Sequence, residues 1–341
     1  MQRQELGLIT SKLLRTLIQN LRGGPVFFLQ FTLDYRLKNI YIKYMIKKGC
    51  KKISEELEES LRNRVIAFTK KYARKPHLAV IQVKGNVASD VYVRKKTEMC
   101  ANLGIQSTQL LLENNITEEE LISKIEGLNK DDGVDGILVQ LPLPSHIDES
   151  RVIDTICIEK DVDGFSKETT GLISQNRSSI YPCTPYGILY CLKYWNVPLE
   201  SKRAVVVGRS SIVGKPISYM LTNENATVTL CHSKTSKEDL KRYCLDADII
   251  VIVVGAPRLI DSSYVKEGAW VIDVGVNRIE DASKEKGYRL VGDFDYTETP
   301  ENTAKNFTVT KVPGGIGLMT IIMLMNNTLK CAEMREEKKN V

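Results

Sequence analysis

The pattern of apolar and polar positions after residue 48 predicts helices and strands in alternation. Between Lys51 and Tyr72 the apolar residues recur near a period of 3.6, which is typical of an amphipathic helix. Ser89 is the expected N-cap of a second helix, and Thr117 precedes a third, whose first turn carries the acidic residues that the helix dipole favours. The expected elements are buried strands at 78–83, 107–112 and 136–141, and helices at 90–103 and 118–128. This alternation predicts a parallel sheet with right-handed crossovers.

The same alternation begins again after residue 200. The expected elements are strands at 204–207, 226–230, 248–254 and 270–274, and helices at 182–195, 215–221 and 237–243. We expect a loop over 160–171 and a methionine-rich closing helix that runs to about Leu329. The predicted fold class is therefore α/β with two domains that carry parallel sheets. The first spans 48–190, with 318–335 packing back on it, and the second, Rossmann-like, spans 191–317.

Composition and charge limit the partners of the chain. The 341 residues have a formal net charge of +6, and residues 1–48 hold nine Lys and Arg against two acidic residues. Because the rest is close to neutral, a nucleic-acid-binding surface is not expected. The sequence contains no apolar run long enough for a membrane span, so no membrane partner is expected. Residues 1–47 form an extension of uncertain role: a targeting segment, a disordered extension, or an upstream start before Met45.

The cysteines and histidines indicate the compartment. Eight scattered cysteines without a CxxC pair, and only three histidines, predict neither a disulfide framework nor a metal site. They favour a reducing compartment, and we expect a cytoplasmic protein. An organelle matrix is the alternative if residues 1–47 are a targeting segment.

The stretch 203–216, RAVVVGRSSIVGKP, has the pattern of a phosphate-binding turn. An apolar strand ends at Gly208, while Gly214 and Pro216 mark the start of a helix. In such a turn, backbone N–H groups and the positive end of the helix dipole face an anion. The spacing differs from the GxGxxG of dinucleotide folds, so a tight turn without a ligand stays open as the alternative.

The end of the next strand bears on the choice of nucleotide. NAD-selective sites usually carry an acidic residue about 20 residues after the glycine turn, where it holds the ribose hydroxyls. Here the strand is followed by Cys231, His232, Ser233 and Lys234, and Arg209 lies in the turn itself. A serine hydroxyl and cations suit a 2′-phosphate, so the sequence favours NADP over NAD. We interpret His232 as structural rather than as a general base.

Five polar residues of the first domain are candidates for chemistry. Ser89, Tyr92 and Lys96 share one helix face, so a phenol and an ammonium would lie side by side; a solvated face is the alternative. Gln140 lies at the carboxyl end of a strand, where open α/β sheets bind ligands, unless it is a buried amide satisfied by the backbone. Asp163, in KDVDGF, has no further ligands at calcium-loop spacing, and we interpret it as a substrate-binding carboxylate.

The order of these motifs resembles the methylenetetrahydrofolate dehydrogenase/cyclohydrolase family, the bifunctional folate enzymes called FolD. The matching segments, from about residue 49 to 331, are ASDVYVRKK, DGILVQLPLP, KDVDGF, PCTP, VVVGRSSIVGKP, ATVTLCHSKT, VIDVGVNR, LVGDFDY and VPGGIGLMT. The resemblance implies a folate-binding catalytic domain, an NADP-binding Rossmann domain, a cleft between them and a homodimer. It implies hydride transfer from 5,10-methylenetetrahydrofolate to NADP⁺ and hydrolysis of the methenyl product to 10-formyltetrahydrofolate, in one-carbon metabolism and purine biosynthesis.

The resemblance also implies roles for single residues. Lys96 would be the catalytic lysine, Tyr92 would line the folate pocket, and Gln140 would contact the lysine. Asp163 would hold the pterin. The other implied folate contacts are Ser89, Leu141, Pro313, Gly314 and Gly315, and the implied NADP contacts are Gly208, Arg209, Ser210, Val213, Gly214, Pro216, Ser233 and Val276.

The chain departs from the family pattern at four positions. Lys84 and Val87 replace a glycine and a proline before the Tyr/Lys helix, and Lys311 and Leu318 replace prolines near the implied folate site. Three rival interpretations are weaker. Short-chain dehydrogenases place the glycine turn before the Tyr/Lys pair, whereas here it follows. An NAD-linked enzyme with dehydrogenase activity alone is disfavoured by the lysine and the acid-free strand end. A non-enzymatic nucleotide-binding protein would not need the polar residues of the first domain.

Overall fold

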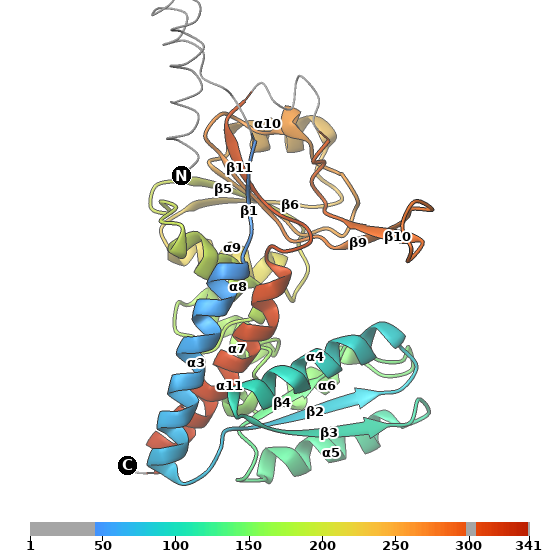
Figure 1. Ribbon diagram of the computed structural model, residues 1–341, viewed down its shortest axis with the longest axis vertical. Helices are drawn as coiled ribbons and strands as arrows, with labels where there is room; N and C mark the ends of the chain where they lie inside the picture. Colours follow the sequence, from blue (N-terminus) through green and yellow to red (C-terminus); the bar gives the residue numbers. More distant parts are fainter. Residues whose placement is uncertain (1–44, 298–304, 340–341) are drawn as a thin grey trace, which may run out of the picture. The chain divides into compact units, whose positions relative to one another are not determined.

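The computed structural model describes residues 45–297 and 305–339, so most of the extension expected over 1–47 lies outside the described residues (Figure 1). Within the described residues, no helix is long and apolar enough to cross a membrane. Residues 44–341 form one compact unit that contains both predicted sheets.

A three-stranded parallel sheet in the order β3–β2–β4 underlies the first domain. Its strands are β2 (His77–Val83), β3 (Gln106–Leu112) and β4 (Gly136–Val139). The helices around it are α3 (Lys51–Tyr72), α4 (Val87–Leu103), α5 (Glu118–Lys130), α6 (Glu149–Thr155), η1 (Ile158–Lys160), α7 (Lys167–Ser174) and α8 (Cys183–Tyr194). The helix predicted over 51–72 is confirmed, and of its apolar residues Ile53, Leu57, Leu61, Val65 and Phe68 are buried, whereas Ile66 is exposed.

The second sheet has six parallel strands in the order β1–β11–β8–β7–β5–β6. The strands are β1 (Met45–Lys48), β5 (Arg203–Val207), β6 (Thr227–Cys231), β7 (Ile249–Ile252), β8 (Trp270–Asp273) and β11 (Phe307–Thr310). Helices α9 (Gly214–Asn223), α10 (Lys237–Asp246) and η2 (Ser262–Tyr264) connect them. The predicted α/β class with two parallel sheets is confirmed.

Four strands were not predicted: β1 and β11 of this sheet, and β9 and β10, which lie outside it. β1 pairs with β11, with Met45 opposite Phe307, so residues 45–47 belong to the sheet although the sequence placed them in the extension. A separate antiparallel hairpin joins β9 (Asn277–Glu280) and β10 (Tyr288–Val291). β1 and β11 are far apart in the sequence, and the two hairpin strands carry several polar or charged residues. Neither pair shows a clear apolar period in the sequence.

Capping side chains explain where helix boundaries differ from the prediction. Ser89 is not an N-cap: α4 starts at Val87, and the Asn86 side chain accepts from the Ser89 N–H at 3.2 Å. The helix expected after Thr117 is confirmed as α5, and Thr117 forms a complete capping box on it. The predicted loop over 160–171 was wrong in its second half because Ser166 caps α7. The predicted strand 136–141 ends at Val139.

The closing helix α11 (Gly317–Lys339) packs against α8 and α3, as predicted, and Met319, Met323 and Met325 are buried in the core (Figure 1). It extends ten residues beyond the predicted end at Leu329. Ion pairs hold this charged last part in place.

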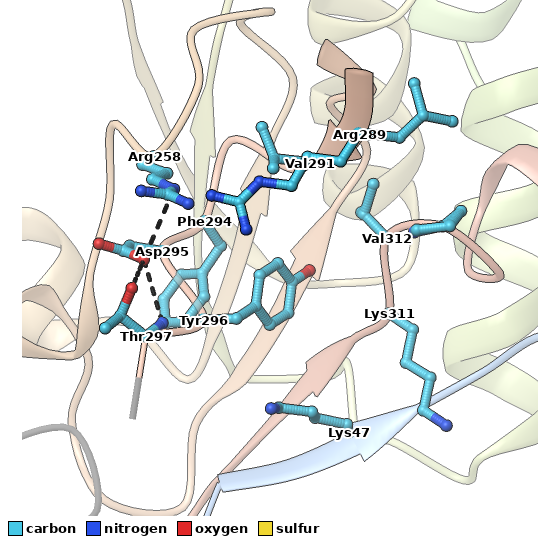
Figure 2. Close-up of a pocket in the computed structure, with 12 residues that line it drawn as sticks. Lys47, Arg258, Arg289, Val291, Phe294, Asp295, Tyr296, Thr297, Lys311 and Val312 are labelled. Carbon is cyan, nitrogen blue, oxygen red and sulfur yellow. Dashed lines mark hydrogen bonds and ion pairs between the residues drawn. The ribbon is translucent and has the colours of Figure 1, made fainter. Parts of the chain in front are cut away.

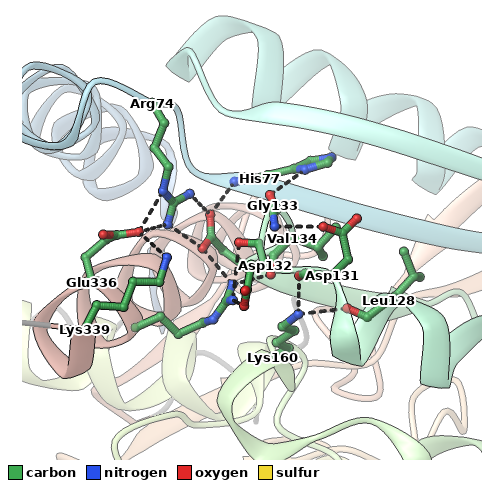
Figure 3. Close-up of polar contacts among 12 residues, drawn as sticks. Arg74, His77, Leu128, Asp131, Asp132, Gly133, Val134, Lys160, Glu336 and Lys339 are labelled. Atoms are coloured by element: carbon green, nitrogen blue, oxygen red, sulfur yellow. Dashed lines mark hydrogen bonds and ion pairs between the residues drawn. The ribbon is translucent and has the colours of Figure 1, made fainter.

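A cluster of charges fixes α11 to the amino end of β4. Asp135 is fully buried and accepts two hydrogen bonds from Arg74, at 2.7 and 2.8 Å, and one from Arg335 at 3.0 Å. Figure 3 shows Arg74 reaching Glu336 of α11 as well. Removing the arginines would leave this carboxylate buried and charged without a partner, which strongly destabilises a folded protein. The ion pairs therefore help to hold α11 in position. It lies at the end of the sheet opposite the polar residues described next.

Candidate functional site

Two predicted site residues of the first domain meet at the carboxyl end of its sheet. The Nζ of Lys96, on α4, donates a hydrogen bond of 2.9 Å to the Oε1 of Gln140. Gln140 directly follows β4, and its backbone N–H still donates to the Ile81 carbonyl, so the strand fixes the direction of the side chain. The amide nitrogen donates to the Leu141 carbonyl at 2.6 Å, which leaves the amide oxygen for the lysine.

Asp163 lies close enough to Lys96 for the two charges to interact. Burial raises the pKa of Asp163, and the Lys96 ammonium opposes that shift. The loop that carries Asp163 is rigid because the buried Asp161 carboxylate accepts hydrogen bonds from the Gly164 and Ser166 N–H groups. Asn327 of α11 adds a hydrogen bond of 2.9 Å to the Val162 carbonyl. The closing helix therefore helps to hold the predicted pterin carboxylate.

A cavity of about 450 Å³ opens beside this cluster. Tyr92, which is 53% exposed, lines it together with Val276 and the segment 311–318, so Pro313, Gly314 and Gly315 face the same space. Lys96, Gln140 and Asp163 are not among its lining residues. The structure thus brings Tyr92 and the predicted residues of both domains together around one cavity, next to the lysine cluster.

Ser89 and Leu141 occupy supporting positions. Ser89 is 4% exposed, and its hydroxyl donates a long hydrogen bond of 3.5 Å to the Leu141 carbonyl. The same carbonyl accepts from Gln140. Leu141 therefore bonds directly to the amide that contacts the lysine, and Ser89 shares the Leu141 carbonyl with that amide.

The glycine turn after β5 has the geometry of a dinucleotide cradle. Gly208 has φ +123, and a Cβ there would lie 2.4 Å from the Val253 carbonyl oxygen. A Cβ at Gly214 would lie 2.1 Å from the Gly208 carbonyl oxygen. Only glycine fits either position, so the turn packs tightly against the end of β7 and the start of α9. Helix α9 begins at Gly214 with Pro216 in its first turn, as predicted.

Ser210 and Val213 shape the turn. The Ser210 hydroxyl accepts from the backbone N–H groups of Val213 and Gly214, each at 3.2 Å. This hydroxyl therefore fixes the start of α9, a structural task in addition to the predicted nucleotide contact.

Arg209 and Ser233 lie at equivalent positions after two neighbouring strands, β5 and β6. Val207 and Cys231, which end β5 and β6, are direct partners in the parallel ladder. Arg209 and Ser233 come two residues later, and both are exposed at this edge of the sheet. His232 is built into the backbone turn, where its Nδ1 accepts from the Lys234 N–H at 3.2 Å. The structural interpretation of His232 agrees with this contact.

Sequence analysis missed two buried carboxylates at the same edge. Asp293 accepts hydrogen bonds from the Val254 and Gly255 N–H groups at 2.8 and 2.9 Å, which fixes the loop after β7. Asp273 accepts from the Phe294 N–H at 3.1 Å and also lines the 450 Å³ cavity. Both are fully buried. They join three loops around the carboxyl ends of β7 and β8.

A sequence signal for Asp273 existed. Like Gln140, it is a polar residue at the carboxyl end of an otherwise apolar parallel strand. Burial raises the pKa of Asp273 to about 6, although hydrogen bonds from Tyr296 and Phe294 oppose the shift. The signal at Asp293 is weaker, because β10 before it has only four residues, none of them buried, and Gly292 separates the strand from Asp293.

Comparison with known proteins decides the family. Residues 49–163 match the description "Tetrahydrofolate dehydrogenase/cyclohydrolase, catalytic domain", and residues 182–336 match "Tetrahydrofolate dehydrogenase/cyclohydrolase, NAD(P)-binding domain". The chain belongs to the tetrahydrofolate dehydrogenase/cyclohydrolase family. It is 47% identical to "Bifunctional protein FolD" of Agathobacter rectalis over 280 residues, which are 82% of this chain and 96% of the relative.

Solved structures of this family support the fold. The crystal structure of the bifunctional FolD enzyme from Campylobacter jejuni is 43% identical, with a TM-score of 0.78, and the match covers 84% of this chain and 98% of that one. The Trypanosoma brucei FolD, solved with NADP and an inhibitor, is 34% identical, with a TM-score of 0.79 and coverage of 85% and 98%. The family resemblance predicted from the motifs is confirmed.

Proposed function

We propose that the chain oxidises 5,10-methylenetetrahydrofolate with NADP⁺ and hydrolyses the methenyl product to 10-formyltetrahydrofolate. The observation that carries the proposal is the hydrogen bond between Lys96 and Gln140, next to a cavity that residues of both domains line. Membership of the family and the bifunctional relatives support both activities.

The dehydrogenase step requires the substrate and the nicotinamide to lie face to face. When bound, NADP⁺ supplies the hydride acceptor. Tyr92 and the segment Pro313–Gly315 would hold the folate in the cavity, with Val276 on the side of the nucleotide domain. Asp163 would hold the pterin ring through its carboxyl group. No protein nucleophile is needed, and positioning alone can supply much of the rate enhancement.

The hydrolase step requires a group that accepts and returns a proton. Water adds to the cationic methenyl carbon, and the Lys96 amine takes the proton that this water loses. The lysine then returns the proton to the ring nitrogen as the ring opens. Gln140 would hold Lys96 in the position for both transfers, because its oxygen accepts from Nζ and its nitrogen is fixed by the Leu141 carbonyl.

NADP fits the nucleotide edge of the second sheet. The Gly208 and Gly214 cradle would take the pyrophosphate, while Arg209 and Ser233 would contact the 2′-phosphate. The Trypanosoma brucei relative, solved with NADP, supports this choice. The NAD-linked alternative has less support, since no acidic residue follows β6 at the predicted place.

Three further points stay predictions. We divide the chain into a folate-binding domain over 48–190 and an NADP-binding domain over 191–317. The homodimer that the resemblance implies is checked by light scattering of the purified chain. A cytoplasmic location is checked by localising a tagged full-length chain, with and without residues 1–47.

Product identification tests the proposed function. The purified chain is incubated with 5,10-methylenetetrahydrofolate and NADP⁺, and the folates are separated by chromatography. We expect NADPH and 10-formyltetrahydrofolate in equal amounts. Formation of the methenyl compound without 10-formyltetrahydrofolate, beyond its spontaneous hydrolysis, would support the monofunctional alternative. No reduction of either NADP⁺ or NAD⁺ would contradict the assignment.

A further inference from the structure

Tyr296 lies where two cavities meet. It lines a second cavity, of about 440 Å³, together with Lys311, Val312 and Pro313 (Figure 2). The same three residues also line the predicted folate cavity. The Tyr296 hydroxyl in turn contacts Asp273, which lines the folate cavity alone. Tyr296 is therefore placed to act on the wall that the two cavities share.

The Tyr296 hydroxyl has two oxygen neighbours and one hydrogen. Its oxygen lies 2.8 Å from the Oδ2 of Asp273 and 2.6 Å from the Thr310 carbonyl oxygen. A carbonyl oxygen can only accept, so the phenol can donate a full hydrogen bond to one of these neighbours at a time. Burial and the neighbouring Asp273 raise the pKa of Tyr296, so the hydrogen stays on the phenol. Both contacts are full hydrogen bonds only when Asp273 carries a proton and donates it to the phenol oxygen.

The surroundings of Asp273 accommodate both of its protonation states. Burial raises the pKa of Asp273 to about 6. The ionised form is also supported, because the carboxylate accepts from the backbone N–H groups of Gly275, Asp293 and Phe294, at 3.2, 3.0 and 3.1 Å. Asp273 therefore changes its protonation state near pH 6 and is not confined to one form.

Charged groups from several segments face this pair. Asp293, on the same loop as Tyr296, opposes the ionisation of Asp273, and the Lys47 Nζ lies 6.0 Å from the centre of the Tyr296 ring. The charged residues that line the second cavity with Tyr296 are Lys47, Arg258, Arg289, Asp295 and Lys311. The titratable residues that line the folate cavity with Asp273 are Tyr92, Lys95, Glu98 and Lys311. A pH effect of Asp273 is therefore assigned by comparing variants that leave all these groups in place.

The end of β11 positions the folate-binding segment. Thr310 is fully buried, and its hydroxyl accepts from the Asp273 N–H at 2.8 Å and donates to the Asp273 carbonyl at 3.1 Å. Directly after it the chain turns so tightly that a Cβ at Gly315 would lie 2.2 Å from the Lys311 carbonyl oxygen. Because the segment 311–315 starts at Thr310, a shift at the end of β11 moves the residues that line the folate cavity.

We propose that Tyr296 is a positioning residue for the folate-binding segment 311–315, and that Asp273 sets the direction of its hydrogen bond. This inference rests on the proposed function. With Asp273 protonated, the acid donates to Tyr296 and Tyr296 donates to the Thr310 carbonyl, which holds the end of β11. With Asp273 ionised, the phenol donates to the carboxylate and the Thr310 carbonyl loses this donor. We therefore expect the protonated form to bind folate more tightly.

Calorimetric titration with tetrahydrofolate at about pH 5.5 and about pH 7.5 tests the proposal without turnover. The quantity compared is the ratio of the Kd at the higher pH to the Kd at the lower pH. We expect this ratio to be roughly two- to tenfold larger for wild type than for Tyr296→Phe, which keeps the ring and removes the hydroxyl. Comparing the two ratios cancels the ionisation of the folate and of the groups that both proteins share.

Two further variants locate the effect. Asp273→Asn cannot ionise, so its ratio should fall to that of Tyr296→Phe. Tyr264→Phe is the matched control, since Tyr264 is a partly buried tyrosine of η2 that lines neither cavity, and it should keep the wild-type ratio. Circular dichroism establishes that each variant is folded.

Steady-state kinetics separate positioning from catalysis. The KM of Tyr296→Phe for 5,10-methylenetetrahydrofolate should lose the same pH dependence as the Kd. Its kcat should change little, because the hydrogen bond between Lys96 and Gln140 does not involve Tyr296.

The outcomes distinguish this role from the proposed function. Equal Kd ratios for wild type and Tyr296→Phe would overturn the positioning role even if both reactions proceed. A wild-type ratio that survives in folded Asp273→Asn would overturn the part assigned to Asp273. Absence of turnover, with a ratio that both variants reduce, would contradict the proposed reactions and leave the positioning role standing. Failure of the wild type to bind tetrahydrofolate at either pH would contradict both.

Discussion

The Nζ of Lys96 donates its hydrogen bond to the Oε1 of Gln140, and the Gln140 amide nitrogen is held by the next carbonyl of its own chain. The Gln140 amide, directly after β4, thereby fixes a flexible lysine side chain of α4 that lies 44 residues earlier in the chain. We expect the position of the Lys96 amino group to depend on this contact with Gln140.

Gln140→Met tests this dependence, because methionine has a similar shape and cannot accept the lysine hydrogen bond strongly. We expect hydrolysis of methenyltetrahydrofolate to fall roughly 10- to 100-fold. The measurement is the hydrolysis rate of methenyltetrahydrofolate by the folded variant. A Gln140→Met rate equal to that of wild type would contradict the positioning role.

Arg209→Ala tests the choice of nucleotide. If Arg209 contacts the 2′-phosphate, the apparent KM for NADP⁺ should rise roughly 10- to 100-fold, while the KM for NAD⁺ changes little. The matched control is Arg242→Ala, an exposed arginine on α10 that pairs with Asp239. Equal effects on the two nucleotides would count against the 2′-phosphate contact.

Asp273→Asn tests the buried carboxylate through the pH dependence of stability. Since burial raises the pKa of Asp273 to about 6 from the ordinary 3.8, the folded protein holds this proton more tightly than the unfolded chain. The stability that protonation contributes is fully present below about pH 3.8 and is lost as the pH rises through about 6. Asparagine does not titrate, so the variant lacks this loss.

The expected result is a change in the free energy of unfolding of the wild type minus that of Asp273→Asn. This difference should fall by roughly 2 kcal/mol between about pH 4.5 and about pH 7. Denaturant titrations at several pH values measure it. A difference that is constant, or that grows with pH, would show that Asp273 has no raised pKa in the folded protein.

Local patterns explain what could be predicted from the sequence. Helix α3 followed from its apolar period and α5 from the acidic residues of its first turn after Thr117, because both signals lie within one element. Gln140 and the glycine turn followed from a general rule, that parallel strands bind ligands at their carboxyl ends. The same rule, applied to Asp273, would have found it.

Contacts between distant segments explain what could not be predicted. The pairing of Met45 with Phe307 joins residues more than 260 positions apart, and neither strand has a long apolar run. The cavity that Lys47, Arg258, Arg289 and Lys311 line is likewise assembled from separate segments. Only the folded chain places them around one space.

The hydrolysis of methenyltetrahydrofolate by Lys96→Met tests the central claim most directly. The compound is supplied without NADP⁺, and its decay is followed by absorbance. The parallel samples are wild type, Lys96→Met, buffer and the control Lys124→Met, which changes an exposed lysine on α5. Circular dichroism of each variant establishes that it is folded. General acid–base catalysis contributes roughly 10²- to 10⁴-fold, so we predict a Lys96→Met rate close to that of buffer, with Lys124→Met equal to wild type. A folded Lys96→Met variant that hydrolyses the compound at the wild-type rate would contradict the account.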